Sequence, residues 1–144
     1  MKKVTYLIVF IGIISLFTAG CFDVMKNEEQ FIEVKKRIGD ENKYEDFRKI
    51  TTNNQVQKVK DILEDSDWEN AKVSMVRPPD YKFVFRFKNP ETEAKAVLYE
   101  LWISPKKDQV ELVIDAESKY VQLDKNKSAE LFEILTNGKL SDLK

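Results

Sequence analysis

Hydrophobic and polar residues alternate along the second half of the chain, which is the pattern of half-buried β-strands. The alternation is clearest over residues 81–88, where aromatic side chains take every second position: Tyr81, Phe83, Phe85 and Phe87. Similar patterns predict strands at 96–103, 110–114 and 120–123. Turn-forming sequences at 89–93 and 104–108 separate them, so we expect an antiparallel meander.

The first half of the chain predicts shorter strands. Ile32, Val34 and Ile38 alternate with charged residues and indicate one strand, and residues 47–50 indicate a second. The intervening residues 39–46 have the composition of a loop. A further strand is predicted at 73–76, before a turn at 77–80 that contains two prolines.

Two segments have the spacing of amphipathic helices. Residues 51–54 supply N-cap chemistry, and the apolar positions that follow share one helical face: Val56, Val59, Ile62 and Leu63. Asp124 is expected to cap a second helix that ends with Gly138 at its C′ position. Its inward residues are predicted to be Ala129, Leu131, Phe132 and Leu135. The elements predict one α+β domain, an antiparallel β-sheet meander with two helices packed on one face.

The first twenty residues have a different pattern. Lys2 and Lys3 precede an apolar run over residues 4–17, whose fourteen positions would make a helix of roughly 21 Å. That length is short of the ~30 Å hydrocarbon core of a bilayer. Small residues follow at Thr18, Ala19 and Gly20, so residues 1–20 are predicted to be a secretory signal peptide.

The sequence Thr18-Ala19-Gly20-Cys21 resembles the lipobox of bacterial lipoproteins, with threonine where leucine is usual. The resemblance implies cleavage before Cys21 and a diacylglyceryl group on its sulfur, which would anchor the protein to the cell membrane facing outside the cytoplasm. The alternatives are an uncleaved membrane helix and a plain secretory signal with an incidental cysteine. The organisation predicted is a signal peptide (1–20), a lipidated cysteine with a tether (21–30) and one domain (31–144).

Composition narrows the possible functions. After residue 20 the chain has 22 basic and 25 acidic residues, a mixed balance that gives no case for nucleic-acid binding. Histidine is absent from the whole sequence, and only Gly39 and Gly138 follow residue 20. No metal, cofactor or phosphate-loop site is therefore predicted, and we expect no catalytic activity.

Three further patterns could serve catalysis or metal binding, but each has a simpler interpretation. Asp115 and Glu117 could form an acid pair, but carboxylates at strand ends are usually solvated. Ser104 and Lys106 could form a serine–lysine pair, but they lie in a predicted hairpin turn. Residues 40–46 are acidic, yet they lack the spacing of a calcium loop.

The predicted sheet places apolar residues on the face opposite the helices: Val84, Leu98, Trp102 and Val113. A face open to water should not need them, so they form a candidate patch for a partner or ligand. The other interpretation is an ordinary half-buried face, covered by Trp68 or by residues 139–144.

Three segments resemble the YhfM-like domain of small Bacillus lipoproteins, a family of uncharacterised function: PDY at 79–81, YELW at 99–102 and the sequence of residues 120–135. The resemblance implies a lipid-modified Cys21 and a short α+β domain, and it implies no catalytic residues.

The leading hypothesis is a lipid-anchored extracytoplasmic domain that binds a protein or a cell-envelope component. The alternative is a small-ligand binding or sensing domain with a pocket between sheet and helices, which a cavity lined by Tyr99, Tyr120 and Trp102 would support. A third, a hydrolase that uses carboxylates, would need two acids converging in a cleft.

Overall fold

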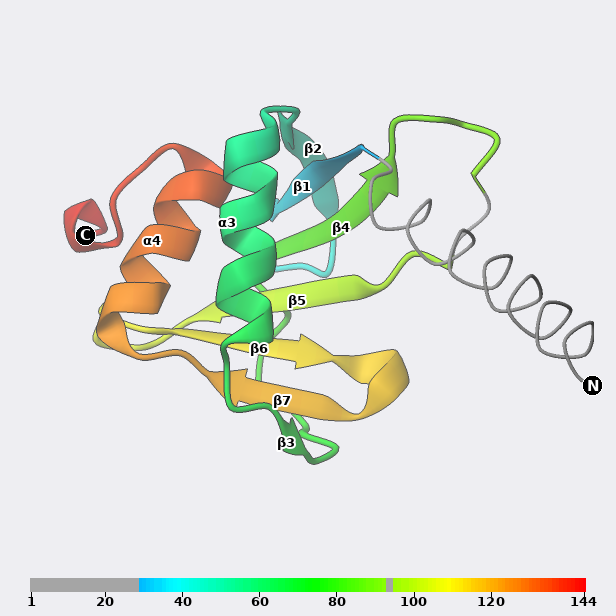
Figure 1. Ribbon diagram of the computed structural model, residues 1–144. Helices are drawn as coiled ribbons and strands as arrows, with labels where there is room; N and C mark the ends of the chain where they lie inside the picture. Colours follow the sequence, from blue (N-terminus) through cyan, green and yellow to red (C-terminus); the bar gives the residue numbers. More distant parts are fainter. Residues whose placement is uncertain (1–28, 93–94) are drawn as a thin grey trace, which may run out of the picture.

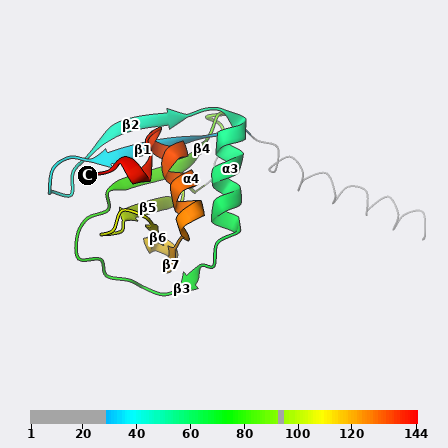
Figure 2. The same ribbon diagram turned by 90° about the vertical axis from the view of Figure 1, so that its left-hand side faces the viewer.

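The protein has two main layers, a β-sheet and a pair of helices packed on one of its faces (Figures 1 and 2). The structure is a computed structural model, and the residues it describes are 29–92 and 95–144. Figure 2 shows a long connection that runs along the side of the sheet away from the helices. We call the side of the sheet away from the helices the outer face. We call this connection, residues 71–80, the crossing segment.

Seven strands form a single antiparallel sheet in the order β2-β1-β4-β5-β6-β7-β3. Strands β4 to β7 form the predicted meander, and β1 joins it beside β4. The strands are β1 (Gln30–Arg37), β2 (Tyr44–Ile50), β3 (Glu69–Asn70), β4 (Tyr81–Phe87), β5 (Leu98–Ile103), β6 (Val110–Ile114) and β7 (Lys119–Gln122).

The helices are α3 (Asn53–Glu64) and α4 (Lys125–Thr136), and the short 3₁₀ turns are η1 (Asp115–Glu117) and η2 (Leu140–Asp142). Helix α3 buries the four apolar residues predicted from its sequence spacing. Both helices cover the same face of the sheet (Figure 2), so the predicted α+β architecture is confirmed.

Helix α4 begins as predicted but differs in two details. The Asp124 carboxylate accepts a hydrogen bond from the Lys127 amide at 2.8 Å, as an N-cap should. Ala129 is exposed, and the buried position beside it is Ser128. At the other end, Asn137 rather than Gly138 takes the left-handed conformation, with φ of 60°. Asparagine tolerates that region better than most residues.

The core lies between the helices and the sheet and is built around aromatic rings. Phe83 stacks on Tyr99 with ring centroids 4.9 Å apart, and Tyr81 meets Phe132 edge-on at 6.0 Å. Phe83 and Phe132 are both almost completely buried. The alternating aromatic residues of β4 therefore form the floor on which α3 and α4 pack.

Two strand predictions need correction. Strand β2 begins at Tyr44, inside the stretch predicted as a loop. The strand predicted at 73–76 does not form, because those residues lie over the outer face rather than beside a free strand edge. Among the described residues of that region, Glu69–Asn70 form the strand pairing, against the start of β7.

The polar residue Ser128 connects α4 to the sheet through two hydrogen bonds. It is fully buried, its Oγ accepts from the Val110 amide at 2.9 Å, and it donates to the Leu123 carbonyl at 3.2 Å.

Ser128→Ala should lower the free energy of unfolding by about 1–3 kcal/mol, because the Val110 amide loses its partner. Ser141→Ala, at an exposed position, is the control in the same denaturant titration. Equal stability of the two variants would contradict this role.

Candidate functional site

The four residues of the predicted patch do share the outer face of the sheet. Val84 pairs with Leu98 across β4 and β5, and Val113 pairs with Glu100, two residues from Trp102 on β5. The alternate positions of the same strands point to the helices and form the core. The two-residue period of the sequence therefore placed these four side chains on the correct face.

Only part of this predicted patch is open. Trp102 and Val113 are each 4% exposed, whereas Leu98 is 42% exposed and Val84 is half-buried. Residues 73–79 of the crossing segment lie over Trp102 and Val113. The expectation of a four-residue open patch is therefore corrected, because the crossing segment covers half of it. Of the two other covers considered, Trp68 packs on the core at the helix side, whereas residues 139–144 contribute Leu143 and Lys144 to a pocket that Trp102 also lines.

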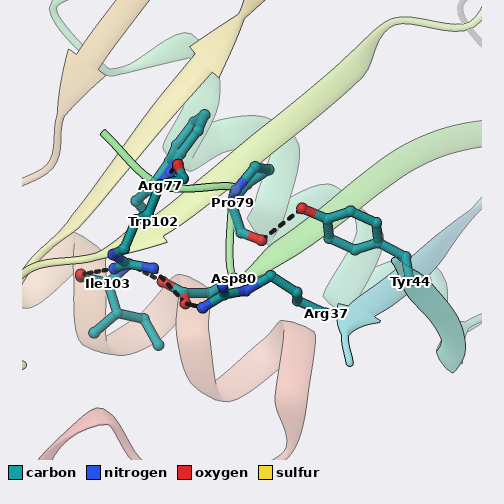
Figure 3. Close-up of polar contacts among 7 residues, drawn as sticks. All are labelled: Arg37, Tyr44, Arg77, Pro79, Asp80, Trp102 and Ile103. Atoms are coloured by element: carbon teal, nitrogen blue, oxygen red, sulfur yellow. Dashed lines mark hydrogen bonds and ion pairs between the residues drawn. The ribbon is translucent and has the colours of Figure 1, made fainter. Parts of the chain in front are cut away.

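The crossing segment is held down at Asp80, just before β4 (Figure 3). The Asp80 carboxylate accepts from Arg77 at 2.6 Å, from Arg37 at 3.3 Å and from the Ile103 amide at 2.7 Å. Its side chain is 17% exposed. Asp80 thus joins β1, β5 and the crossing segment through partly buried, charge-assisted hydrogen bonds.

Two further contacts fix the same segment (Figure 3). The Trp102 indole donates to the Arg77 carbonyl at 2.8 Å, and the Tyr44 hydroxyl donates to the Pro79 carbonyl at 2.8 Å. The indole N–H is satisfied by the backbone that covers its ring, so Trp102 has the contacts of a structural residue.

An open cleft lies at one end of the sheet, where α3 faces the ends of β1, β4 and β5. Its volume is about 600 Å³, within the range of small-molecule sites. The apolar residues that line it come from α3, from the strands and from the connection before β5: Phe31, Leu63, Phe85, Phe87, Val97 and Tyr99. The cleft fits the expectation of a pocket between sheet and helices.

Charged groups also line the cleft. Lys60 and Glu64 come from α3, Arg86 from β4, and Lys95 from the connection between β4 and β5. The Lys60 ammonium lies 5.9 Å from the centroid of the Phe85 ring, which is cation–π distance. Arg86 pairs with Glu33 at 3.1 Å. Sequence reasoning missed Lys60 and Glu64, because it read only the apolar face of α3.

The aromatic cavity considered in the alternative hypothesis does not assemble. Tyr99 faces the helices and lines the cleft, and burial raises the pKa of its hydroxyl. Trp102 and Tyr120 lie on the outer face instead. The Tyr120 hydroxyl donates to Glu111 at 2.6 Å, and burial together with this bond raises the pKa of Tyr120 to about 12.

The residues of the catalytic and metal-binding patterns named from the sequence lie in turns or at exposed positions. Ser104 accepts from the Gln109 amide at 3.2 Å and donates to Asp108 at 3.3 Å, which closes the hairpin between β5 and β6. Asp115 and Glu117 are both exposed in η1. Asp40 and Asp46 are exposed as well, and Asp46 pairs with Lys35.

The lipobox residues Thr18, Ala19, Gly20 and Cys21 lie outside the described part of the chain. Within 29–92 and 95–144, neither helix has the length and apolar character needed to cross a membrane. In those same ranges, no group of three or more acidic or cysteine side chains is placed to hold a metal ion.

A family model described as YhfM protein matches residues 25–141. No curated protein matches the sequence. Among solved structures, the chain is similar to a thioesterase-like protein from Clostridium sporogenes ATCC 15579, with a TM-score of 0.54 and 15% sequence identity. The match covers 78% of this chain and 98% of that protein. At this identity the similarity shows a shared fold and no more.

The Asp80 contacts predict how the outer face responds to mutation. Asp80→Ala should lower the free energy of unfolding by about 2–3 kcal/mol, because two guanidinium groups and one amide lose a partly buried acceptor. When Trp68 is replaced by phenylalanine, Trp102 is the one tryptophan left. In that background, acrylamide should quench the Trp102 fluorescence more strongly with Asp80→Ala than with Asp80 intact.

The control is Glu33→Ala, which removes an exposed ion pair with Arg86 and should cost less than about 1 kcal/mol. If Asp80→Ala left both stability and quenching at the level of the control, the crossing segment would be held by other contacts.

Proposed function

This chain belongs to the YhfM family, and we propose that it is a lipid-anchored, extracytoplasmic binding domain without catalytic activity. The sequence of residues 1–21 supports the anchor, since a basic start, a short apolar run and Ala-Gly-Cys follow one another. Two acyl chains on one cysteine would hold a soluble domain stably at a membrane.

The observation that supports a binding function is the cleft between α3 and the sheet. It is lined by Gln30 and Phe31, the first two residues of β1, so it lies where the chain enters the fold. Nine residue steps separate Cys21 from Gln30, which span at most about 30 Å when extended. A protein anchored at Cys21 would therefore keep its cleft close to the membrane surface, within reach of cell-envelope components.

A binding function without catalysis agrees with the positions of the catalytic candidates named from the sequence. Ser104 closes a turn, and Asp115 and Glu117 are solvated rather than directed into the cleft. The sequence has no histidine to act as a general base.

A second candidate function is the binding or sensing of a small soluble ligand in the same cleft. The cleft volume of about 600 Å³ and its aromatic floor favour this function. A cell-envelope component would be captured by crosslinking on intact cells, whereas a soluble ligand would be found in extracts of the purified protein.

The anchor is tested at Cys21. Cys21→Ala should release the protein into the medium or leave it as a larger precursor, because the acceptor of the lipid is removed. The measurement is membrane fractionation with gel migration of the expressed full-length chain. Ser15→Ala, inside the apolar run, is the control and should behave like the wild type. Wild-type fractionation and migration of Cys21→Ala would show that the lipoprotein proposal is wrong.

A further inference from the structure

We infer that the cleft between α3 and the ends of β4 and β5 binds a small zwitterion with an apolar body. The inference rests on the binding function proposed above for this cleft and names the chemistry of its ligand. It follows from the placement of two opposite charges beside an aromatic surface.

Lys60 and Glu64 supply the two charges. They are four residues apart on α3, so they lie on one side of the helix with Cβ atoms about 5–6 Å apart, and both line the cleft. Among the residues that the structure describes, neither takes part in an ion pair. Both charges are therefore available to a ligand that carries an acid group for Lys60 and an ammonium group for Glu64.

The apolar body of the ligand has a matching surface next to these charges. Leu63 lies on α3 between them, and the half-buried rings of Phe85 and Tyr99 line the same cleft. Lys60 is already within cation–π distance of Phe85, so its ammonium lies over the apolar surface. A ligand whose charged groups adjoin a ring or a short apolar chain would contact both the charged pair on α3 and this apolar surface.

The other charges near the cleft do not favour a purely anionic ligand. Arg86 is neutralised by Glu33, and Lys88 pairs with Glu29 at 3.1 Å. Lys95 lines the cleft and adds one cation, which suits either a carboxylate or a phosphate ester as the acid group. The same chemistry could come from a free amino acid or peptide, or from the headgroup of a zwitterionic phospholipid.

The test titrates the full-length protein with phosphatidylglycerol nanodiscs present as the only membrane. This lipid is not a zwitterion, and the readout does not require the protein to be bound to the nanodiscs. The probes are L-phenylalanine, its amide without the acid group, and its N-acetyl derivative without the ammonium group. The readout is tryptophan fluorescence, since the Trp68 ring lies 6.3 Å from that of Tyr99. L-phenylalanine should bind at least about threefold more tightly than either derivative, as expected for loss of one exposed ion pair.

A second arm uses dibutyrylphosphatidylethanolamine, a short-chain phospholipid, to distinguish the two ligand sources. Tighter binding of this lipid than of L-phenylalanine would identify a headgroup, and the reverse would identify a free zwitterion. Either order supports the inference. If no probe binds, or if all three phenylalanine compounds bind equally, the inference is wrong.

Matched variants locate the binding site. Lys60→Gln should remove the advantage of L-phenylalanine over its amide, and Glu64→Gln should remove its advantage over the N-acetyl derivative. Lys58→Gln, at an exposed position of the same helix that does not line the cleft, should bind like the wild type. Wild-type discrimination by both Lys60→Gln and Glu64→Gln would overturn the inference. Because the readout is independent of Cys21, failure of the lipid anchor would not be mistaken for failure of the cleft.

Discussion

The carboxylate of Asp80 joins parts of the chain that are far apart in sequence. Arg37 reaches it from β1, the Ile103 amide from β5, and Arg77 from the crossing segment itself. These bonds hold residues 73–79 over Trp102 and Val113, which covers half of the apolar patch predicted on the outer face. On the helix side of the molecule, an open cleft of about 600 Å³ lies where α3 faces the strand ends. How the crossing segment is held therefore sets how much of the predicted patch on the outer face is open.

Local periodicity was sufficient to predict most of the fold. The apolar spacing of α3 and the alternation in β4 to β7 depend on neighbouring residues along the chain, so they could be read directly. The crossing segment could not, because the pairing of Asp80 with Arg37 is non-local and gives no sequence pattern. Ser128 was missed in favour of Ala129 because its burial depends on a hydrogen bond to Val110, eighteen residues away.

The candidate site was predicted less well than the fold, and for a physical reason. Val84, Leu98, Trp102 and Val113 were assigned to the correct face, but sequence cannot show which connection covers them. The cleft combines residues from β1, α3, β4 and β5, and only the tertiary structure brings Lys60, Phe85 and Tyr99 together. Its position where the chain enters the fold connects the binding proposal with the anchor proposed at Cys21.

If a lipid-held domain presents this cleft outside the cytoplasm, as proposed, a thiol placed in the cleft should be reachable from outside the cell. Cys21 is the only cysteine, and its sulfur is blocked if it carries lipid. A cysteine introduced by Glu64→Cys, at an exposed position of the cleft, is then the single reactive thiol. A membrane-impermeant maleimide should label this variant on intact cells and should leave the wild type unlabelled. Labelling of the variant only after lysis would contradict the proposal.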